Sequence, residues 1–194
     1  MRPYGVGREL QDYVGIPAEG YDVLVRKLLS GCGVVTGLSY QKLEEAFQGI
    51  GDCILYTGPI DQFFEYSLGW LEYHSLRFEE EVRNEPDYQG QAIKDCPDEE
   101  PPCRIIEHRH FTGAVGKKTV ITREYGEEWI PGRGRYHPVE DERNRALHKQ
   151  YLELAKAQHP NFVFGGRMGE HRDYTMAETI AAALKKVKEL TDHS

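Results

Sequence analysis

Apolar residues recur at helical spacing in four parts of the chain, and each part predicts an amphipathic helix. These parts are residues 20–29, 40–48, 140–158 and the segment that follows Thr175. The last helix has the clearest start, because Thr175 and Glu178 fit the S/T-x-x-E capping box. Its apolar stripe consists of Met176, Ile180, Ala183, Leu184 and Val187.

Shorter runs rich in β-branched and aromatic residues predict strands, separated by turns that contain glycine, proline, asparagine or aspartate. The predicted strands are residues 34–38, 53–56, 71–82, 89–94, 103–111, 117–125 and 162–164. Those between 71 and 125 follow one another with short links, which is typical of an antiparallel sheet. We therefore predict an α+β fold, an antiparallel (mixed) sheet of about six strands with flanking helices and a C-terminal helix. Residues 1–194 are expected to form a single domain, with residues 1–16 as an extended N-terminal arm.

Composition narrows the class of protein. The 194 residues are 39% hydrophobic and contain no run of about 18 apolar residues, so no membrane span is predicted. A net charge of −8 argues against nucleic-acid binding. Residues 1–10 show no signal-peptide pattern and the four cysteines form no CxxC pair, so reduced thiols and a cytoplasmic location are expected. A disulfide is conceivable for one pair, Cys96 and Cys103, which bracket a proline-rich turn.

Two of the eight histidines raise the question of a metal site. His108 and His110 alternate with Glu107 and Arg109 in the predicted strand 103–111, so the two imidazoles would share one face. No third ligand stands at a recognisable spacing, and charged strand faces are usually solvated or salt-bridged. No metal site is therefore predicted.

Two arginines and a polar loop are candidates for binding or acid–base chemistry, although the chain has no GxGxxG dinucleotide motif. Arg104 follows two prolines and Cys103, a rigid lead-in that would fix its guanidinium for a diphosphate; a surface ion pair is the alternative. Arg167 lies in a GGRMG turn, which is either a plain tight turn or an approach for a phosphate. Residues 171–173 (HRD) either supply acid–base groups or form a polar loop that caps the last helix.

Seven segments, taken together, resemble UDP-galactopyranose mutase, the flavoenzyme family that interconverts the pyranose and furanose forms of UDP-galactose. In chain order they are YVGIPAEGYDVLVRKLL (13–29), YTGPIDQFF (56–64), LEYHSLRFE (71–79), RIIEHRHF (104–111), TVITREY (119–125), YHPV (136–139) and GGRMGEHRDYTM (165–176). No single segment is decisive, but their order and spacing match almost from end to end. The resemblance implies the antiparallel-sheet region and the closing C-terminal helix of that family, without its N-terminal Rossmann-type flavin unit.

The resemblance also implies roles for individual residues. Binding of the nucleotide-sugar substrate is implied for Arg104, Tyr136 and Lys94, the last of which replaces a family asparagine. Contacts to the flavin are implied for Gly166, Arg167, Met176 and Thr175, the last of which replaces an aspartate. His74 replaces a family arginine, and His137 and Asp173 replace tyrosines, so these three residues are the candidates for a catalytic role of the chain's own.

The implied reaction is a covalent isomerisation. In the family, N5 of the reduced flavin (FAD) attacks the anomeric carbon, UDP leaves, and the sugar ring opens and recloses. Three hypotheses follow: a mutase-like isomerase on a nucleotide sugar such as UDP-galactose, with a separate FAD-binding subunit; a flavin-independent enzyme on a related nucleotide or sugar; and a non-catalytic diphosphate-binding module. A partner subunit or a homodimer is expected, because a sheet that normally packs on a flavin domain would expose an apolar patch.

Overall fold

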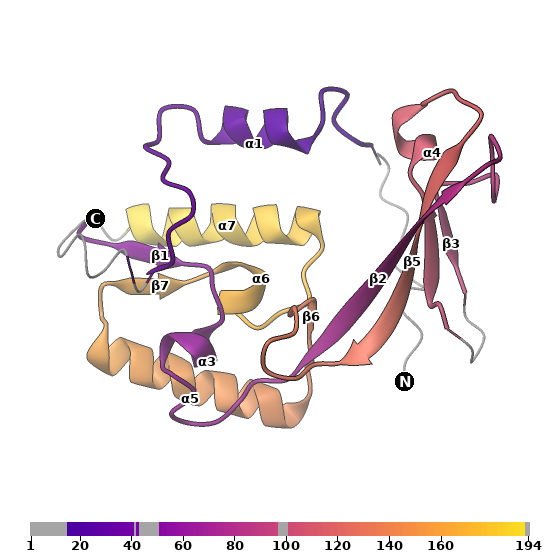
Figure 1. Cartoon of the computed structure of the whole chain (residues 1–194). Coiled ribbons are helices and arrows are strands. Elements are labelled where there is room, and N and C mark those ends of the chain that lie inside the picture. Colours follow the sequence, from indigo (N-terminus) through magenta and orange to yellow (C-terminus); the bar gives the residue numbers. More distant parts are fainter. Residues whose placement is uncertain (1–14, 41, 43–50, 97–100, 193–194) are drawn as a thin grey trace. The chain divides into compact units, whose positions relative to one another are not determined.

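The computed structural model describes residues 15–40, 42, 51–96 and 101–192 (Figure 1). The chain divides into two compact units, which we call unit 1 (Met1–Ile50 and Glu80–Arg123) and unit 2 (Gly51–Glu79 and Glu124–Ser194). Within the described ranges, no helix has the length and apolar character needed to cross a membrane.

The main sheet has five strands in the order β3-β4-β5-β2-β6. Their bounds are β2 Tyr73–Arg83, β3 Ile93–Asp95, β4 Arg104–Glu107, β5 Thr119–Glu128 and β6 His137–Pro138. β3 pairs with β4, and β2 with β6, in antiparallel register. β2 and β5 are long enough to pass from one unit into the other. The α+β class with an antiparallel sheet is thereby confirmed.

The described part of unit 1 contains β3, β4 and the helices α1 (Tyr21–Leu28) and α4 (Arg109–Thr112). No residue of α1 is buried, and its apolar side chains Leu24, Val25 and Leu28 are exposed. In the sheet part of this unit, Ile121 on β5 is fully buried. The fully buried Glu107, at the end of β4, is the most unusual residue of the unit, because carboxylates are almost never fully buried unless they are paired.

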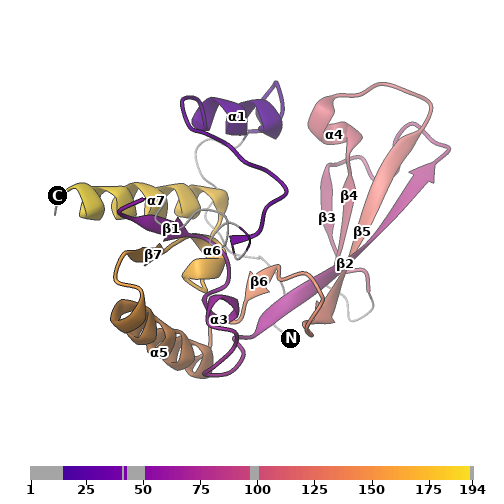
Figure 2. The same cartoon turned by 60° about the vertical axis from the view of Figure 1, so that its left-hand side comes forward.

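Unit 2 contains a small parallel sheet in which β1 (Ile54–Tyr56) pairs with β7 (Phe162–Phe164). This sheet lies between α5 (Glu142–Gln158) and α7 (Met176–Thr191), as both views show (Figures 1 and 2). Two one-turn helices, α3 (Ile60–Phe63) and α6 (Gly166–Gly169), complete the unit. Its core consists of Ile60, Leu71, Tyr73, Tyr151, Ala155 and Phe164. The helices predicted from residue 140 and from Thr175 are thus confirmed.

The predicted strand 103–111 is too long, because the structure ends β4 at Glu107. The next residues turn into α4, whose C-cap Gly113 has a φ of 66°, a left-handed conformation that suits glycine. His110 therefore lies on a helical turn, and His108 bonds instead to the Thr122 hydroxyl at 2.7 Å from Nε2. The expectation that the two histidines share a strand face is wrong.

Three other predicted elements are either wrong in part or lie outside the described residues. Residues 34–38 form no strand; Val34 and Val35 are exposed, and Gly37 has a φ of 72° that breaks the extended run. The strand predicted for residues 89–94 begins only at Ile93, because Gly90 turns the chain and donates its N–H to the Asp87 carboxylate. The helix predicted for residues 40–48 lies almost wholly outside the described residues. The four cysteines, all of them among the described residues, form no disulfide, and the N–H of Cys96 bonds to the carbonyl of Cys103.

The capping box at the start of α7 is confirmed. The Thr175 hydroxyl accepts the N–H of Glu178, and the Glu178 carboxylate accepts the N–H of Thr175 at 2.6 Å.

Replacement of Thr175 by alanine is expected to lower the free energy of unfolding by about 1 kcal/mol, because a helical N–H loses its acceptor. Chemical denaturation checks this value, with Thr175→Ser as the control that keeps the hydroxyl and should stay near the wild type. Equal losses in both variants would show that the threonine methyl matters, not the cap.

Candidate functional site

The pairing of β2 with β6 places two of the predicted catalytic histidines side by side. His74 stands directly opposite His137 in the antiparallel register, so their side chains share one face of this ladder. The N–H of Tyr136 donates to the carbonyl of His74 at 3.1 Å, and the N–H of Val139 donates to the carbonyl of Glu72 at 3.0 Å. These bonds fix the short β6 strand on β2. His74 is exposed, and His137 is about one quarter exposed.

Three side chains meet beside β6, and we call them the His137 cluster: His137, Arg167 and Asp173. Nδ1 of His137 lies 3.0 Å from Oδ1 of Asp173 and 2.7 Å from Nη2 of Arg167. The same Nη2 donates to Oδ1 of Asp173. Nδ1 can donate to the carboxylate or accept from the guanidinium, depending on the tautomer, but it cannot do both. The cluster therefore joins an acid–base group to a fixed positive and a fixed negative charge.

The backbone around α6 aims Arg167 and Asp173 at His137. Gly166 begins α6 with a φ of 72°, and a side chain there would contact Thr57, so the GGRMG turn packs closely on the segment after β1. The N–H of Asp173 bonds to the Glu140 carboxylate at 2.7 Å, which orients the loop before α7. Glu140 was not among the predicted site residues, and no spacing signal in the sequence points to it.

Burial by itself would raise the pKa of the Asp173 carboxyl, but the hydrogen bonds from Arg167 and His137 outweigh it, so its pKa lies below the ordinary value. Asp173 is therefore ionised near neutral pH. The Arg167 side chain is 34% exposed, yet its Nε is covered and has no hydrogen-bond partner. Buried donors in proteins usually have an acceptor, so this Nε is a group that could donate to a bound ligand.

A pH-dependent stability follows from the lowered pKa of Asp173. A carboxyl with a lowered folded-state pKa stabilises the fold above its unfolded pKa, and this contribution is lost as the pH falls through the folded pKa. Asp173→Asn is expected to unfold at a temperature that falls less steeply than that of the wild type below about pH 4. Thermal melts from neutral to acid pH give the melting temperatures of both proteins. The difference between the two melting temperatures removes the effect of the other carboxyls, which both proteins share. Parallel melting curves would contradict the assignment.

Tyr136 lies next to this cluster in the chain. Its ring packs edge-on against Phe78 at 5.4 Å between centroids. It also covers Gly134, where a side chain would come within 2.7 Å of the ring. The tyrosine is therefore held in place by packing, with its position set by the bond from its N–H to His74.

The remaining residues with implied flavin roles are used in local structure. The Thr175 hydroxyl takes part in the capping box, and Gly166 packs on Thr57. The Met176 side chain is exposed at the first turn of α7. Of the four, Arg167 alone combines an accessible charge with an unsatisfied donor.

Arg104 and Lys94 belong to unit 1, on the β3–β4 hairpin. Arg104 stands opposite Asp95 and pairs with it, with Nε 2.7 Å from Oδ1. Lys94 stands opposite Ile105, so it occupies the other face of the hairpin. The two residues are thus neighbours in the ladder without sharing a face. Arg104 therefore forms the surface ion pair that was the alternative to diphosphate binding in the sequence-based prediction.

Arg135, which was not among the predicted site residues, is surrounded by aromatic rings. Arg135 donates from Nη1 to Gln62 and from Nη2 to the Tyr66 hydroxyl, and its guanidinium lies 4.7 Å from the centre of the Trp129 ring. The only sequence signal was the Gly- and Arg-rich loop before Pro138. This residue links Gln62, Tyr66 and Trp129 just before β6 begins.

The fold is of the α+β class, and its accessible cluster joins an imidazole, a carboxylate and a guanidinium. The UDP-galactopyranose mutase family matches residues 10–173, so the chain belongs to that family.

Three curated relatives illustrate the match. The chain is 33% identical over 184 residues to a "Probable UDP-galactopyranose mutase" of Klebsiella pneumoniae, which covers 91% of this chain and 46% of the relative. It is 29% identical to the dTDP-fucopyranose mutase of Escherichia coli, over 89% of this chain and 48% of the relative. It is also 29% identical to the UDP-galactopyranose mutase of Mycoplasma pneumoniae, over 91% of this chain and 48% of the relative. The chain spans about half the length of these relatives and corresponds to their C-terminal part.

The described residues do not by themselves fit a whole flavin. The sequence has no dinucleotide motif, and Thr175 and Gly166 are occupied in capping and packing. Arg167 could donate to one anionic or hydrogen-bond-accepting edge of a flavin. The other three residues with implied flavin roles offer no further donor for the flavin.

Proposed function

We propose that this chain is the nucleotide-sugar-binding part of a mutase-type isomerase, which acts on UDP-galactose or a related nucleotide sugar together with a separate flavin-binding chain. The observation that carries the proposal is the accessible His137 cluster in a chain of the mutase family. The names of the relatives support a nucleotide sugar as substrate, because they act on UDP-galactopyranose and dTDP-fucopyranose.

The cluster has the charges that such a substrate needs. The guanidinium of Arg167 would bind a diphosphate oxygen, since a planar fork of donors matches phosphate geometry. His137, with Asp173 on its Nδ1, would hold or release a proton at a sugar hydroxyl. His74 lies beside it on the same face of the ladder and would orient the sugar. Arg104 and Lys94, on unit 1, remain candidates for binding the diphosphate and base.

A partner that carries flavin is supported by the surface of α7. Its apolar stripe points to solvent, with Met176, Ile180, Leu184 and Val187 exposed by 56–68%. Large exposed apolar faces of this kind usually mark a protein interface. Because the chain spans about half the length of its relatives, we propose that the flavin-binding half of a mutase covers this stripe. When bound, a reduced flavin would supply the nucleophile for the anomeric carbon.

A turnover assay tests the proposal. UDP-galactose is incubated with the chain alone and with the chain mixed with the part of the Klebsiella pneumoniae relative that this chain does not match, and the furanose product is separated by anion-exchange chromatography. Under reducing conditions, product is expected only from the mixture, with the intact relative as the positive control. The absence of product from a mixture that forms a yellow complex would contradict the proposal.

A second candidate function is a flavin-independent reaction on a nucleotide or sugar. The hydrogen-bonded pair of His137 and Asp173 favours it, because such a pair can carry out acid–base chemistry without a cofactor. Turnover by the chain alone, abolished in His137→Ala and Asp173→Ala, would support this candidate. Binding of UDP without any turnover in the mixture would instead favour a non-catalytic diphosphate-binding module.

A further inference from the structure

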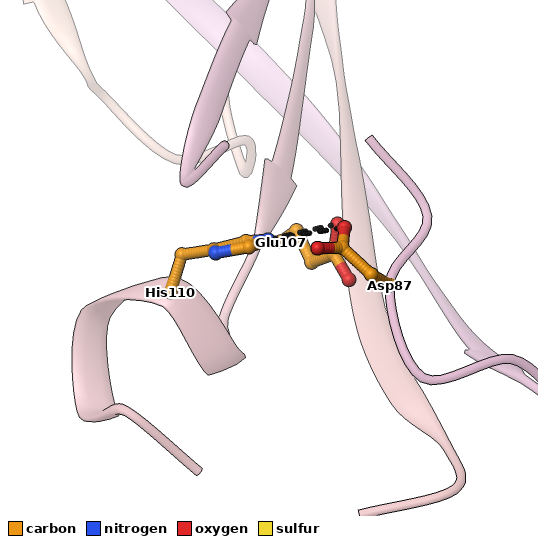
Figure 3. Close-up of side chains that lie close together, drawn as sticks. All are labelled: Asp87, Glu107 and His110. Carbon is orange, nitrogen blue, oxygen red and sulfur yellow. Dashed lines mark hydrogen bonds and ion pairs between the residues drawn. The ribbon is translucent and has the colours of Figure 1, made fainter. Parts of the chain in front are cut away.

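A second cluster of polar side chains lies in unit 1 and shares no residue with those proposed for the nucleotide sugar. It consists of Asp87, Glu107 and His110, whose side chains point toward one another (Figure 3). Nε2 of His110 lies 3.3 Å from Oδ1 of Asp87 and 3.4 Å from Oε2 of Glu107. One ligand atom from each residue lies within 4.8 Å of the other two.

Three different segments hold these residues in place. Asp87 follows β2 in a turn, where its Oδ1 accepts the N–H of Gly90 at 2.7 Å. Glu107 is the last residue of β4 and is fully buried. His110 comes from the one-turn helix α4, so no ligand spacing is visible in the sequence. The side chains meet because α4 folds back over the end of β4 (Figure 3).

Both carboxylates are set to stay ionised. Burial by itself raises the pKa of Glu107, but the N–H groups of Gln89 and Tyr88 outweigh it and hold its pKa below the ordinary value. The N–H of Gly90 lowers the pKa of Asp87, and His110 lowers it further. Two carboxylates that remain charged next to an imidazole are a suitable set of ligands for a divalent cation.

The two distances from His110 resemble those between neighbouring ligands of a metal ion. A charge-assisted N–H···O bond is typically about 2.7–2.9 Å, and the two distances here are longer and nearly equal. Metal–ligand bonds of about 2.0–2.1 Å in a tetrahedral site place neighbouring ligand atoms about 3.3 Å apart. His110 stands at about this separation from each carboxylate, and the three ligand atoms all lie within 4.8 Å of one another.

We propose that Asp87, Glu107 and His110 bind a divalent transition-metal ion of the zinc class, with water as the fourth ligand. One nitrogen and two oxygen ligands suit zinc, whereas calcium requires six to eight oxygen ligands. The site would join the turn after β2, the end of β4 and α4, and thereby stabilise unit 1. The proposal does not depend on the proposed function, because none of its residues belongs to the His137 cluster.

The test uses the chain without a polyhistidine tag, stripped with EDTA and then titrated with Zn²⁺ by calorimetry. The wild type is expected to bind one Zn²⁺, and His110→Ala and Asp87→Asn are expected to bind at least about tenfold more weakly, as for the loss of groups that support a metal site. His108→Ala is the matched control, since His108 lies in the same segment but bonds to Thr122, and it should bind like the wild type.

A second readout keeps the proposal testable if a variant unfolds. Zn²⁺ is expected to raise the melting temperature of the wild type and of His108→Ala, because a ligand that binds the folded state stabilises it. This rise should disappear in His110→Ala. No binding by the wild type, or equal binding by His110→Ala, would overturn the proposal and leave His110 as a partner in an ordinary ion pair.

Discussion

Removal of the Arg167 side chain is expected to weaken the binding of UDP-galactose by at least about tenfold. The guanidinium is the accessible positive charge of the His137 cluster, and its Nη2 also bonds to Asp173 and His137. Arg167→Ala therefore removes the donor for the diphosphate and leaves the Asp173 carboxylate to repel it. Isothermal titration of the variant with UDP-galactose measures the loss.

Two further variants separate the charge from its shape. Arg167→Lys keeps the positive charge but loses the planar fork, so it is expected to bind with intermediate affinity. Arg26→Ala removes an exposed arginine of α1 and should bind as the wild type does. If Arg167→Ala binds as tightly as Arg26→Ala, the cluster does not hold the diphosphate.

Replacement of Tyr151 by alanine is expected to lower the free energy of unfolding by about 3–5 kcal/mol, the largest stability effect foreseen for this chain. Tyr151 on α5 is fully buried in the core of unit 2, and its ring stacks on Phe64. Its hydroxyl donates to the carbonyl of Gly69 at 2.6 Å and accepts the N–H of Leu68 at 3.1 Å. The variant leaves a cavity and also removes both hydrogen bonds.

Tyr151→Phe isolates the hydroxyl, because it keeps the ring and loses only these two bonds. It is expected to cost about 1–2 kcal/mol, since the N–H of Leu68 and the carbonyl of Gly69 both lose their partner. Denaturant unfolding monitored by tryptophan fluorescence measures both variants. A loss below about 1 kcal/mol for Tyr151→Ala would mean that the core of unit 2 tolerates a cavity at its centre.

The helices were predictable because their signals are local. The capping box and the apolar stripe of α7 are set by residues three and four apart, which any window of the sequence contains. The strand 103–111 was predicted too long for the same reason. Its β-favouring composition is local, whereas the turn into α4 depends on Gly113 in a left-handed conformation and on the packing of Glu107.

The candidate site was only partly predictable. The resemblance pointed to His74, His137, Asp173 and Arg167 separately, and the contacts between them arise from the register of β6 on β2 and from the position of α6. No sequence spacing encodes the bond between residues as far apart as His137 and Asp173. Likewise, only the register of the β3–β4 hairpin shows that Arg104 and Lys94 occupy opposite faces.

The proposed zinc-class site was not predictable from the sequence at all. Glu107 and His110 are close in sequence, but Asp87 reaches them only because the turn after β2 folds onto β4. The exposure of the α7 stripe is also a tertiary property. The pattern predicts an apolar face, and only the packed structure shows which apolar faces remain uncovered.

The most direct test of nucleotide-sugar recognition is isothermal titration of the wild-type chain with UDP-galactose. Saturable binding at one molecule per chain is expected, with UDP as a competitor and free galactose without effect, because the diphosphate is the group that Arg167 would bind. No measurable binding of either UDP-galactose or UDP would contradict the proposed role of the His137 cluster.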